Sequence, residues 1–393
     1  MSYSTTLFSA FLCRTSVALV KLVTIPLLFR ALGTQDYACF IILSSLEGWS
    51  LLLDFGLGSV MQHMLPIHYT EHSDATPLLR GTLYLSMLGF FITLCLWMLL
   101  LPFTSKLCSD SLASHHLCLF GIFYLLQAQA SIATKVLIAR KQGHLSYYMQ
   151  TVSALVSLGC LLLFPLTLTC VLYYTLGIQT LFVVALACYT FRHLSLQGPR
   201  SYAALLRALP LFAFNIIASC VTLFDSLLMA FVLSAEEIIS YNLLCKIFGI
   251  LSFLYAAALQ RFSSSSWQKL EANKYRFCLY SITGIVCCSL LLILGRPIIS
   301  LYFSISLLPS CMMLFCLYLI IRVVCDLHAM ILQRRQHMKP LFIFGSIQAL
   351  LSITLQLLFG RLAGAQGLLV GQSLSYVSTV LWALPRYTKE PAS

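Results

Sequence analysis

The sequence predicts an all-α polytopic membrane protein. Its mean hydropathy is +0.92, and 60% of its 393 residues are hydrophobic while only 9% are charged. A soluble domain carries about 25% charged residues. The apolar runs are apolar on every side, whereas the strands of a membrane barrel would alternate apolar and polar residues. Because only helices and closed barrels satisfy their backbone inside a bilayer, we expect the chain to cross the membrane as helices.

Twelve runs of mainly apolar residues match the length of about 20 that a spanning helix needs. The connections between them are short, so no soluble domain is expected. We divide the chain into an N-terminal six-helix lobe over 1–192, a cytoplasmic linker over 193–208 and a C-terminal six-helix lobe over 209–393. The expected spans are residues 7–29, 37–62, 82–103, 117–134, 147–165, 172–191, 209–233, 238–260, 278–295, 308–331, 341–359 and 365–384.

The cations behind the net charge of +12 are distributed unequally between the two sides of the membrane, so the charge does not indicate a nucleic-acid partner. If the N-terminus is cytoplasmic, sixteen Lys and Arg residues, Lys135 among them, fall in inner connections and the C-terminal segment, and four fall in outer connections. Cytoplasmic loops carry such an excess of cations, so both termini are expected inside. The chain shows no catalytic constellation, no metal-ligand spacing among its cysteines and no nucleotide-binding motif, so we expect neither an enzyme nor a cofactor nor a metal site.

Eight charged residues lie inside the expected spans, where an unpaired charge costs about 2.5–3.5 kcal/mol even on the most lenient scale. They are the cations Arg14, Lys21, Lys246 and Arg322 and the acids Glu47, Asp54, Asp225 and Asp326. Such a cost requires compensation, so we expect the cations and acids to form pairs.

Residue spacing indicates which charges pair. The cations of the first span are seven residues apart, as are the acids of the second, so each set shares one helix face. In an antiparallel hairpin centred on Thr34, residues at equal depth have numbers with a constant sum. This rule pairs Lys21 with Glu47. It also pairs Arg14 with Asp54.

In the second half, Asp225 and Lys246 lie about equally far from the turn at 234–237, and Arg322 and Asp326 are i,i+4 partners. Two interpretations remain open for all the pairs. They either only neutralise each other and fix helix register, or line a water-filled cavity that binds an anionic substrate or a coupling ion. Asn215 contacts either sugar hydroxyls or a neighbouring helix.

The segment PLLFRALGTQDYACFIILSSLEGWSLLLDFGLGSVMQ at 26–62 resembles the start of the Wzx-type polysaccharide repeat-unit flippases. These proteins form a branch of the multidrug/oligosaccharidyl-lipid/polysaccharide (MOP) exporter superfamily. The elements that match these flippases are Arg30, Leu32-Gly33, Asp36-Tyr37, Asp54-Phe55-Gly56-Leu57-Gly58, Asp225, Tyr241-Asn242 and the glycine-rich stretch 360–371.

The chain also contains a weak internal repeat. The nine residues LGTQDYACF at 32–40 correspond to LSAEEIISY at 233–241.

The resemblance to the Wzx-type flippases implies two lobes that open alternately to either side of a bacterial inner membrane. The implied cargo is a polyprenyl-diphosphate-linked oligosaccharide, moved to the outer leaflet for surface polysaccharides such as O-antigen. The four internal cations would face the diphosphate, with Asn215 near the sugar, and Asp54 and Asp225 are candidate carriers of H+ or Na+. Besides membrane lipids, a polysaccharide polymerase and glycosyltransferases are the implied partners.

Two alternatives remain from the sequence. One is an ion-coupled multidrug or organic-cation exporter of the same superfamily, which would favour an acidic cavity. The other is a non-transporting scaffold for glycosyltransferases, in which the buried pairs would serve only helix register. The chain also departs from the family in being short and in carrying Ala38 where glycine is frequent.

Overall fold

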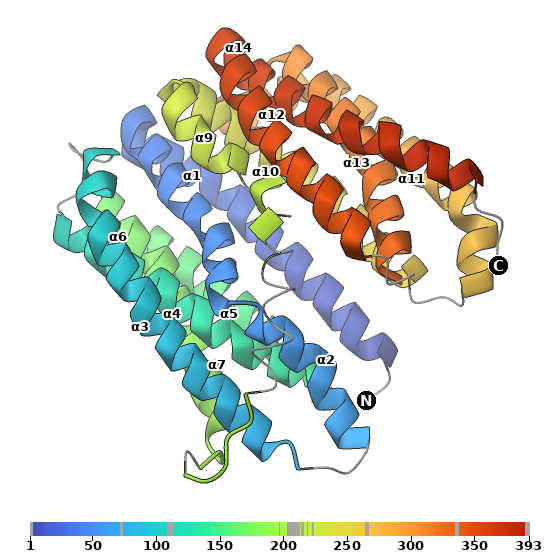
Figure 1. Ribbon diagram of the computed structural model, residues 1–393. Helices are drawn as coiled ribbons and strands as arrows, with labels where there is room; N and C mark the ends of the chain where they lie inside the picture. The colour runs from blue at the N-terminus through green and yellow to red at the C-terminus, as the bar shows by residue number, and fades with distance from the viewer. Residues whose placement is uncertain are drawn as a thin grey trace. The chain divides into compact units, whose positions relative to one another are not determined.

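The structure is a computed structural model that describes residues 3–70, 74–107, 114–140, 142–195, 197–202, 213, 216–217, 219–221, 224–263, 267–334 and 338–389. All regular structure within these ranges is helical. Nine of the described helices are long and apolar enough to cross a membrane. The chain divides into two compact units, Met1–Ile216 and Ile217–Ser393, each drawn as a bundle of long helices in Figure 1. The expected all-α polytopic membrane fold is confirmed.

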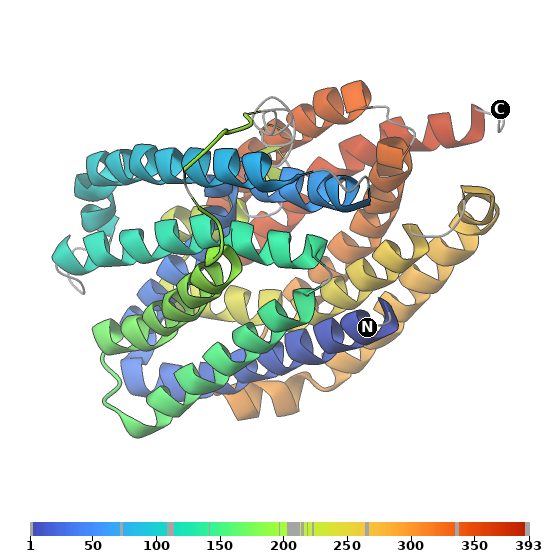
Figure 2. The same cartoon turned by 90° about the horizontal axis from the view of Figure 1, so that it is seen from below.

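The first unit is organised around α4. This helix lies beside α2, α3, α5 and α7, as Figures 1 and 2 show from two directions. In the apolar window of α4, 56% of the residues are buried, against 11–28% for the other spans of this unit. The elements are α1 (Tyr3–Ser50), a 3-10 turn (Leu51–Asp54), α2 (Leu57–Thr70), α3 (Thr76–Leu107), α4 (Ser114–Ala139), α5 (Gly143–Leu163), α6 (Leu168–Leu172), a π-helical turn (Tyr173–Gly177) and α7 (Ile178–Phe191).

In the second unit α13 lies beside α10, α11 and α14, and α14 also lies beside α9. A short helix, α12, occupies a stretch that the sequence indicated as a loop. Pro297 stands in the first turn of α12, and the helix ends at Ser304, which has a left-handed φ of 57°. The elements are α9 (Phe224–Val232), α10 (Ala235–Ser263), α11 (Trp267–Leu294), α12 (Arg296–Phe303), α13 (Pro309–Arg334) and α14 (Met338–Lys389).

Two of the long helices contain a chain reversal and therefore hold two expected spans each. In α1 the reversal is at Gly33, with φ 73° and ψ −178°. In α14 it is at Ala363 and Gly364. A third reversal, between α9 and α10, is at Ser234, which corresponds to Gly33 in the repeat found in the sequence. The Ser234 N–H donates to Glu237 Oε2 at 3.1 Å and the Glu237 N–H donates to Ser234 Oγ at 3.4 Å, a capping box that starts α10.

The expectation of one continuous helix over 37–62 is wrong, because the helix is interrupted at residues 51–56. The backbone forms a 3-10 turn and then takes positive φ at Phe55 (51°) and Gly56 (75°). The cause is local: Asp54 Oδ1 accepts a hydrogen bond from the Gly56 N–H at 2.8 Å, which gives the backbone an alternative to the helix. Asp54 therefore does not continue a straight face from Glu47, as the predicted hairpin register assumed.

The two arms of α14 pack closely against each other. Thr379 Oγ1 donates to Gln348 Oε1 at 2.7 Å, and the side chains of Ser352 and Ser375 have no exposed surface. A Cβ atom added to Gly371 would lie 2.7 Å from the backbone N of Gln356. Each of these pairs has residue numbers with the same sum, so the arms form one antiparallel register centred on the reversal. Gly371 thus permits the close approach of the two backbones.

Candidate functional site

A first group of polar side chains lies in the second unit and begins with Asp225 in the first turn of α9. The Tyr241 hydroxyl, from α10, donates to Asp225 Oδ2 at 2.7 Å, and the Ser226 N–H donates to Asp225 Oδ1 at 2.7 Å. The Tyr241 side chain is only 1% exposed. Hydrogen bonds to a carboxylate are stronger than those between neutral groups, so this contact fixes Asp225 against α10.

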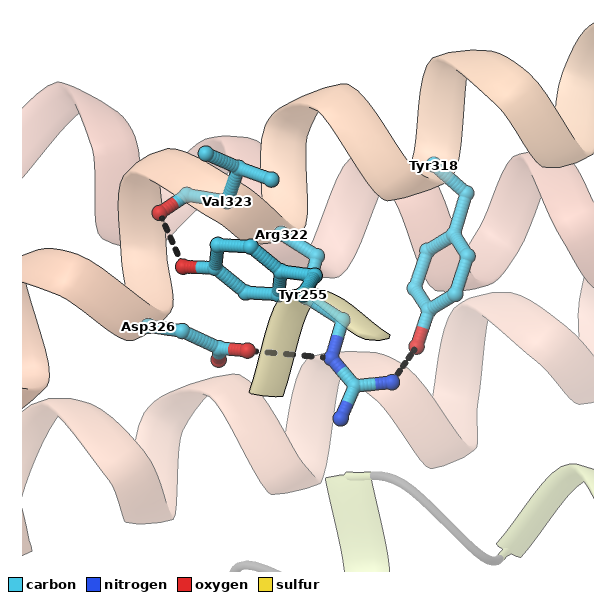
Figure 3. Close-up of polar contacts among 5 residues, drawn as sticks. All are labelled: Tyr255, Tyr318, Arg322, Val323 and Asp326. Carbon is cyan, nitrogen blue, oxygen red and sulfur yellow. Dashed lines mark hydrogen bonds and ion pairs between the residues drawn. The ribbon is translucent and has the colours of Figure 1, made fainter. Parts of the chain in front are cut away.

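Arg322 occupies the centre of the same region, on α13 (Figure 3). Its Nε atom is 3.2 Å from Asp326 Oδ2, which confirms the predicted i,i+4 pair, and its Nη1 donates to the Tyr318 hydroxyl at 3.3 Å. The Arg322 and Asp326 side chains are 29% and 32% exposed. A guanidinium offers five N–H donors, and these contacts use two of them. The group is therefore held in position and still reachable from outside the protein.

Aromatic rings connect the surroundings of Asp225 with those of Arg322. Phe315 has its ring centroid 6.5 Å from that of Tyr241 and 5.8 Å from that of Tyr318, and Tyr318 is 5.6 Å from Tyr376. Asp225 lies close enough to Arg322 for their charges to interact. One guanidinium thus stands near two carboxyl groups, Asp225 and Asp326. Tyr318 was not among the predicted site residues, although it is one helical turn from Arg322 on the same face, and Tyr241 was indicated only as part of the family resemblance.

The Tyr255 hydroxyl gives this region a second support. It comes from α10 and donates to the backbone carbonyl of Val323 at 3.0 Å, as Figure 3 shows. Val323 follows Arg322 directly. The contact therefore fastens the turn of α13 that carries the guanidinium to the neighbouring helix.

A second group of polar side chains lies in the first unit, where the helix before α2 is interrupted. Gln129 of α4 donates from Nε2 to the Leu53 carbonyl at 2.7 Å, and Ser86 of α3 donates from Oγ to Gln129 Oε1 at 2.7 Å. A carbonyl released from a helix inside a membrane needs such a partner, because no water is available there. The two consecutive hydrogen bonds, from Ser86 to Gln129 and from Gln129 to Leu53, therefore stabilise the interruption of the helix.

Asp54 at this interruption is 7% exposed and lies beside Lys135 of α4. A Cβ atom added to Gly58 would be 2.6 Å from Asp54 Oδ2 and 3.1 Å from Lys135 Cγ, which places both side chains against the same glycine. Helix α4 continues to Ala139, so Lys135 lies on the last turns of this helix and not in a connection between helices, while its place on the cytoplasmic side stays a prediction. Its distance from Asp54 in the sequence gave no indication of this proximity.

The other predicted site residues divide into two groups. Lys21 is exposed on α1 and Lys246 is partly buried on α10, and each makes an interaction within its surroundings. The side chains of Arg14 and Glu47, and all of Asn215, lie outside the described residues. The pairs Lys21–Glu47, Arg14–Asp54 and Asp225–Lys246 therefore stay predictions.

Comparison with known proteins finds relatives that are named as transporters. No family model matches the chain. The "Putative O-antigen export protein" of Yersinia pseudotuberculosis is 26% identical to it over 93% of this chain and 91% of that protein. The "Putative O-antigen transporter" of Salmonella typhimurium is also 26% identical, over 96% of this chain and 94% of that protein.

Two solved structures show the same fold. A lipid II flippase, MurJ, in an inward closed conformation has a TM-score of 0.68 at 16% identity, over 98% of this chain and 87% of that one. An outward-facing multidrug resistance MATE transporter of the MOP superfamily has a TM-score of 0.61 at 12% identity, over 97% and 94%.

The chain therefore has the fold of solved multi-pass membrane transporters, and its relatives in sequence are named as transporters and not as enzymes. One of the structures that share this fold is described as a transporter of the MOP superfamily, and the relatives in sequence carry the names of O-antigen export proteins or transporters. This confirms the resemblance carried by residues 26–62.

Proposed function

We propose that the chain flips a polyprenyl-diphosphate-linked oligosaccharide from the cytoplasmic to the outer leaflet of a bacterial inner membrane. The two lobes would open alternately to either side, and the cargo would serve synthesis of a surface polysaccharide such as O-antigen. The names of the sequence relatives support a saccharide cargo, and the fold of a lipid II flippase supports a cargo linked to a lipid.

The observation that carries the proposal is the setting of Arg322. A planar guanidinium can contact a phosphate with two parallel hydrogen bonds, whereas the ammonium of lysine acts as a point charge. Tyr318 and Asp326 hold the Arg322 side chain while leaving it 29% exposed. A diphosphate would therefore meet a cation that is already oriented, and Lys21, Lys246, Arg14 and the amide of Asn215 are proposed as further contacts along the path.

The acids are proposed to couple transport to an ion gradient. One elementary charge that crosses the membrane potential supplies about 2.3 kcal/mol per 100 mV. Asp225, held by Tyr241 next to the Arg322 charge, and Asp54, beside Lys135, are the candidate carriers of H+ or Na+. Glu47 and Asp326 would serve as ion-pair partners.

The test is genetic complementation combined with a leaflet assay. In a strain that lacks the gene, we expect surface polysaccharide to disappear and its lipid-linked precursor to remain on the cytoplasmic face. The wild-type gene should restore export, Arg322→Ala should not, and Arg322→Lys should restore it only in part. Arg276→Ala removes an exposed arginine of the same unit and should behave as wild type. Normal precursor distribution in the deletion strain would disprove flipping.

A multidrug or organic-cation exporter is the second candidate, and the similarity to a MATE transporter favours it. Accumulation of a fluorescent organic cation should rise in the deletion strain if this function is correct and stay unchanged if the cargo is a lipid-linked saccharide. A scaffold for glycosyltransferases or a polymerase would be indicated if Arg322→Ala, together with Asp326→Asn, left export intact while deletion abolished it.

A further inference from the structure

The segment after α7 folds back against the start of α3. We call this segment, residues 192–195 and 197–202, the strap. The Ser201 N–H donates to the Pro77 carbonyl at 2.9 Å, and Arg80 Nε donates to the Ser195 carbonyl at 2.6 Å. Figure 2 shows the strap in yellow-green where it passes across α3. The strap is thus a fixed part of the first unit as far as residue 202.

The fit of the strap depends on two glycines. A Cβ atom added to Gly81 of α3 would lie 2.0 Å from the Ser201 carbonyl oxygen, so the two backbones meet at that position. Gly198 has a φ of 115°, and a Cβ there would lie 2.4 Å from Arg80 Nη1. The strap therefore turns around the Arg80 guanidinium at a residue that only glycine suits.

This arrangement presents Arg200 at the edge of the lipid-facing surface. The Arg200 guanidinium lies over the Tyr84 ring, 4.6 Å from its centroid, and the Tyr202 ring meets that of Tyr84 edge-on at 6.4 Å. Tyr84 is the first of a row of apolar side chains on one face of α3 that are 45–62% exposed: Tyr84, Met87, Leu88, Phe91, Ile92 and Leu96. In a membrane protein such a row faces lipid chains, so its polar end lies at the depth of the lipid headgroups.

The same motif recurs at the end of α7, where Arg192, the first residue of the strap, lies over the Tyr189 ring at 4.6 Å. An arginine stacked on a ring keeps its N–H donors in the plane of the guanidinium, where they can take a phosphate in bidentate fashion. Asp74 is an acid close to Arg80, and its Oδ1 atom accepts a hydrogen bond from the Thr76 N–H at 2.9 Å. The charge of this end of the unit therefore suits an anion, and the sequence predicts that the end is cytoplasmic.

We propose that the strap and α3 form a binding site for the phosphate of an anionic phospholipid, phosphatidylglycerol being the probe. Arg200 would contact the phosphate, Arg80 would add a second cation, and the acyl chains would lie along the apolar row that starts at Tyr84. Anionic lipids of the cytoplasmic leaflet attract basic residues next to the membrane. Here the strap adds fixed geometry to that attraction.

The first experiment measures retention of dioleoyl-phosphatidylglycerol on the purified full-length chain by native mass spectrometry, with dioleoyl-phosphatidylcholine as the neutral lipid. We expect Arg200→Gln to weaken phosphatidylglycerol binding about tenfold, which corresponds to about 1.4 kcal/mol, and to leave phosphatidylcholine unchanged. The control is Arg276→Gln, which removes an exposed arginine elsewhere and should have no effect. Equal weakening by both variants would mean unspecific surface attraction and would overturn the proposal.

The second experiment moves the strap without changing any charge. Gly81→Ala places a methyl group against Ser201 and should weaken phosphatidylglycerol binding as much as Arg200→Gln does, while Gly159→Ala has nothing within 4 Å of its added Cβ and should leave it unchanged. Wild-type affinity in Gly81→Ala would overturn the proposal. So would displacement of phosphatidylglycerol by an equimolar polyprenyl diphosphate, since the site would then belong to the transported lipid.

Discussion

Substitution of Gly371 by alanine tests the packing of the two arms of α14. The added Cβ would lie 2.7 Å from the N atom of Gln356 and from the C and O atoms of Leu355. These are backbone atoms of the facing arm, so no side-chain rotation can relieve the contact and the arms must separate. Overpacking of this kind costs about 1–3 kcal/mol. Alanine also favours the helix over glycine by about 0.5–1 kcal/mol, which offsets part of the loss.

The matched control is Gly284→Ala on α11, where nothing lies within 4 Å of the added Cβ. Because the helix-propensity gain is common to both variants, the difference between their free energies of unfolding isolates the overpacking cost. We expect Gly371→Ala to be less stable than Gly284→Ala by about 1–3 kcal/mol. The assay is reversible unfolding in mixed micelles of increasing dodecyl sulfate content, followed by helical circular dichroism. Equal stability of the two variants would refute the close approach of the arms.

Three further predictions address the first unit and the Asp225 contact. Gln129→Leu should destabilise the fold by about 1–3 kcal/mol, because the Leu53 carbonyl loses its partner inside the membrane. Tyr241→Phe should cost about 0.6–1.7 kcal/mol in the same assay, between the average and the maximum found for hydrogen bonds between membrane helices. Asp74→Ala should destabilise the start of α3 at neutral pH, because the Thr76 hydroxyl and N–H donate to the Asp74 carboxyl and lower its pKa below 3.8. A carboxyl whose pKa is lowered in the folded state stabilises the fold at pH values above 3.8. This stabilisation should disappear as the pH falls through the lowered pKa.

Each of these predictions has a control. Gln150→Leu changes an exposed glutamine of α5 and should leave stability nearly unchanged. If Gln150→Leu lost as much stability as Gln129→Leu, the hydrogen bond from Gln129 to Leu53 would not be the cause. Tyr280→Phe removes the hydroxyl of a tyrosine that is 73% exposed, and Tyr241→Phe should cost more. A difference between Asp74→Ala and wild type that persists unchanged in strong acid would show that the carboxylate charge is not its cause.

The sequence by itself determined the features that depend on neighbouring residues. Apolar length alone decides that a segment enters the bilayer as a helix, since every backbone group must then bond within the segment. The reversals at Gly33 and Gly364 fall where two apolar runs meet with little chain between them. Arg322 and Asp326 could be paired in advance because four residues make one helical turn, whatever the rest of the fold does.

Only the tertiary structure decided which distant side chains meet. Nothing near Asp54 in the sequence indicates Lys135, because their approach depends on how α2 packs against α4. The interruption at 51–56 is stable because Gln129, from α4, donates to the Leu53 carbonyl and is itself held by Ser86, from α3. In the same way, Tyr241 reaches Asp225 through the packing of α9 and α10. Lipid chains are as apolar as the helix surfaces, so helix association depends on shape and on polar contacts, which hydrophobic patterns do not encode.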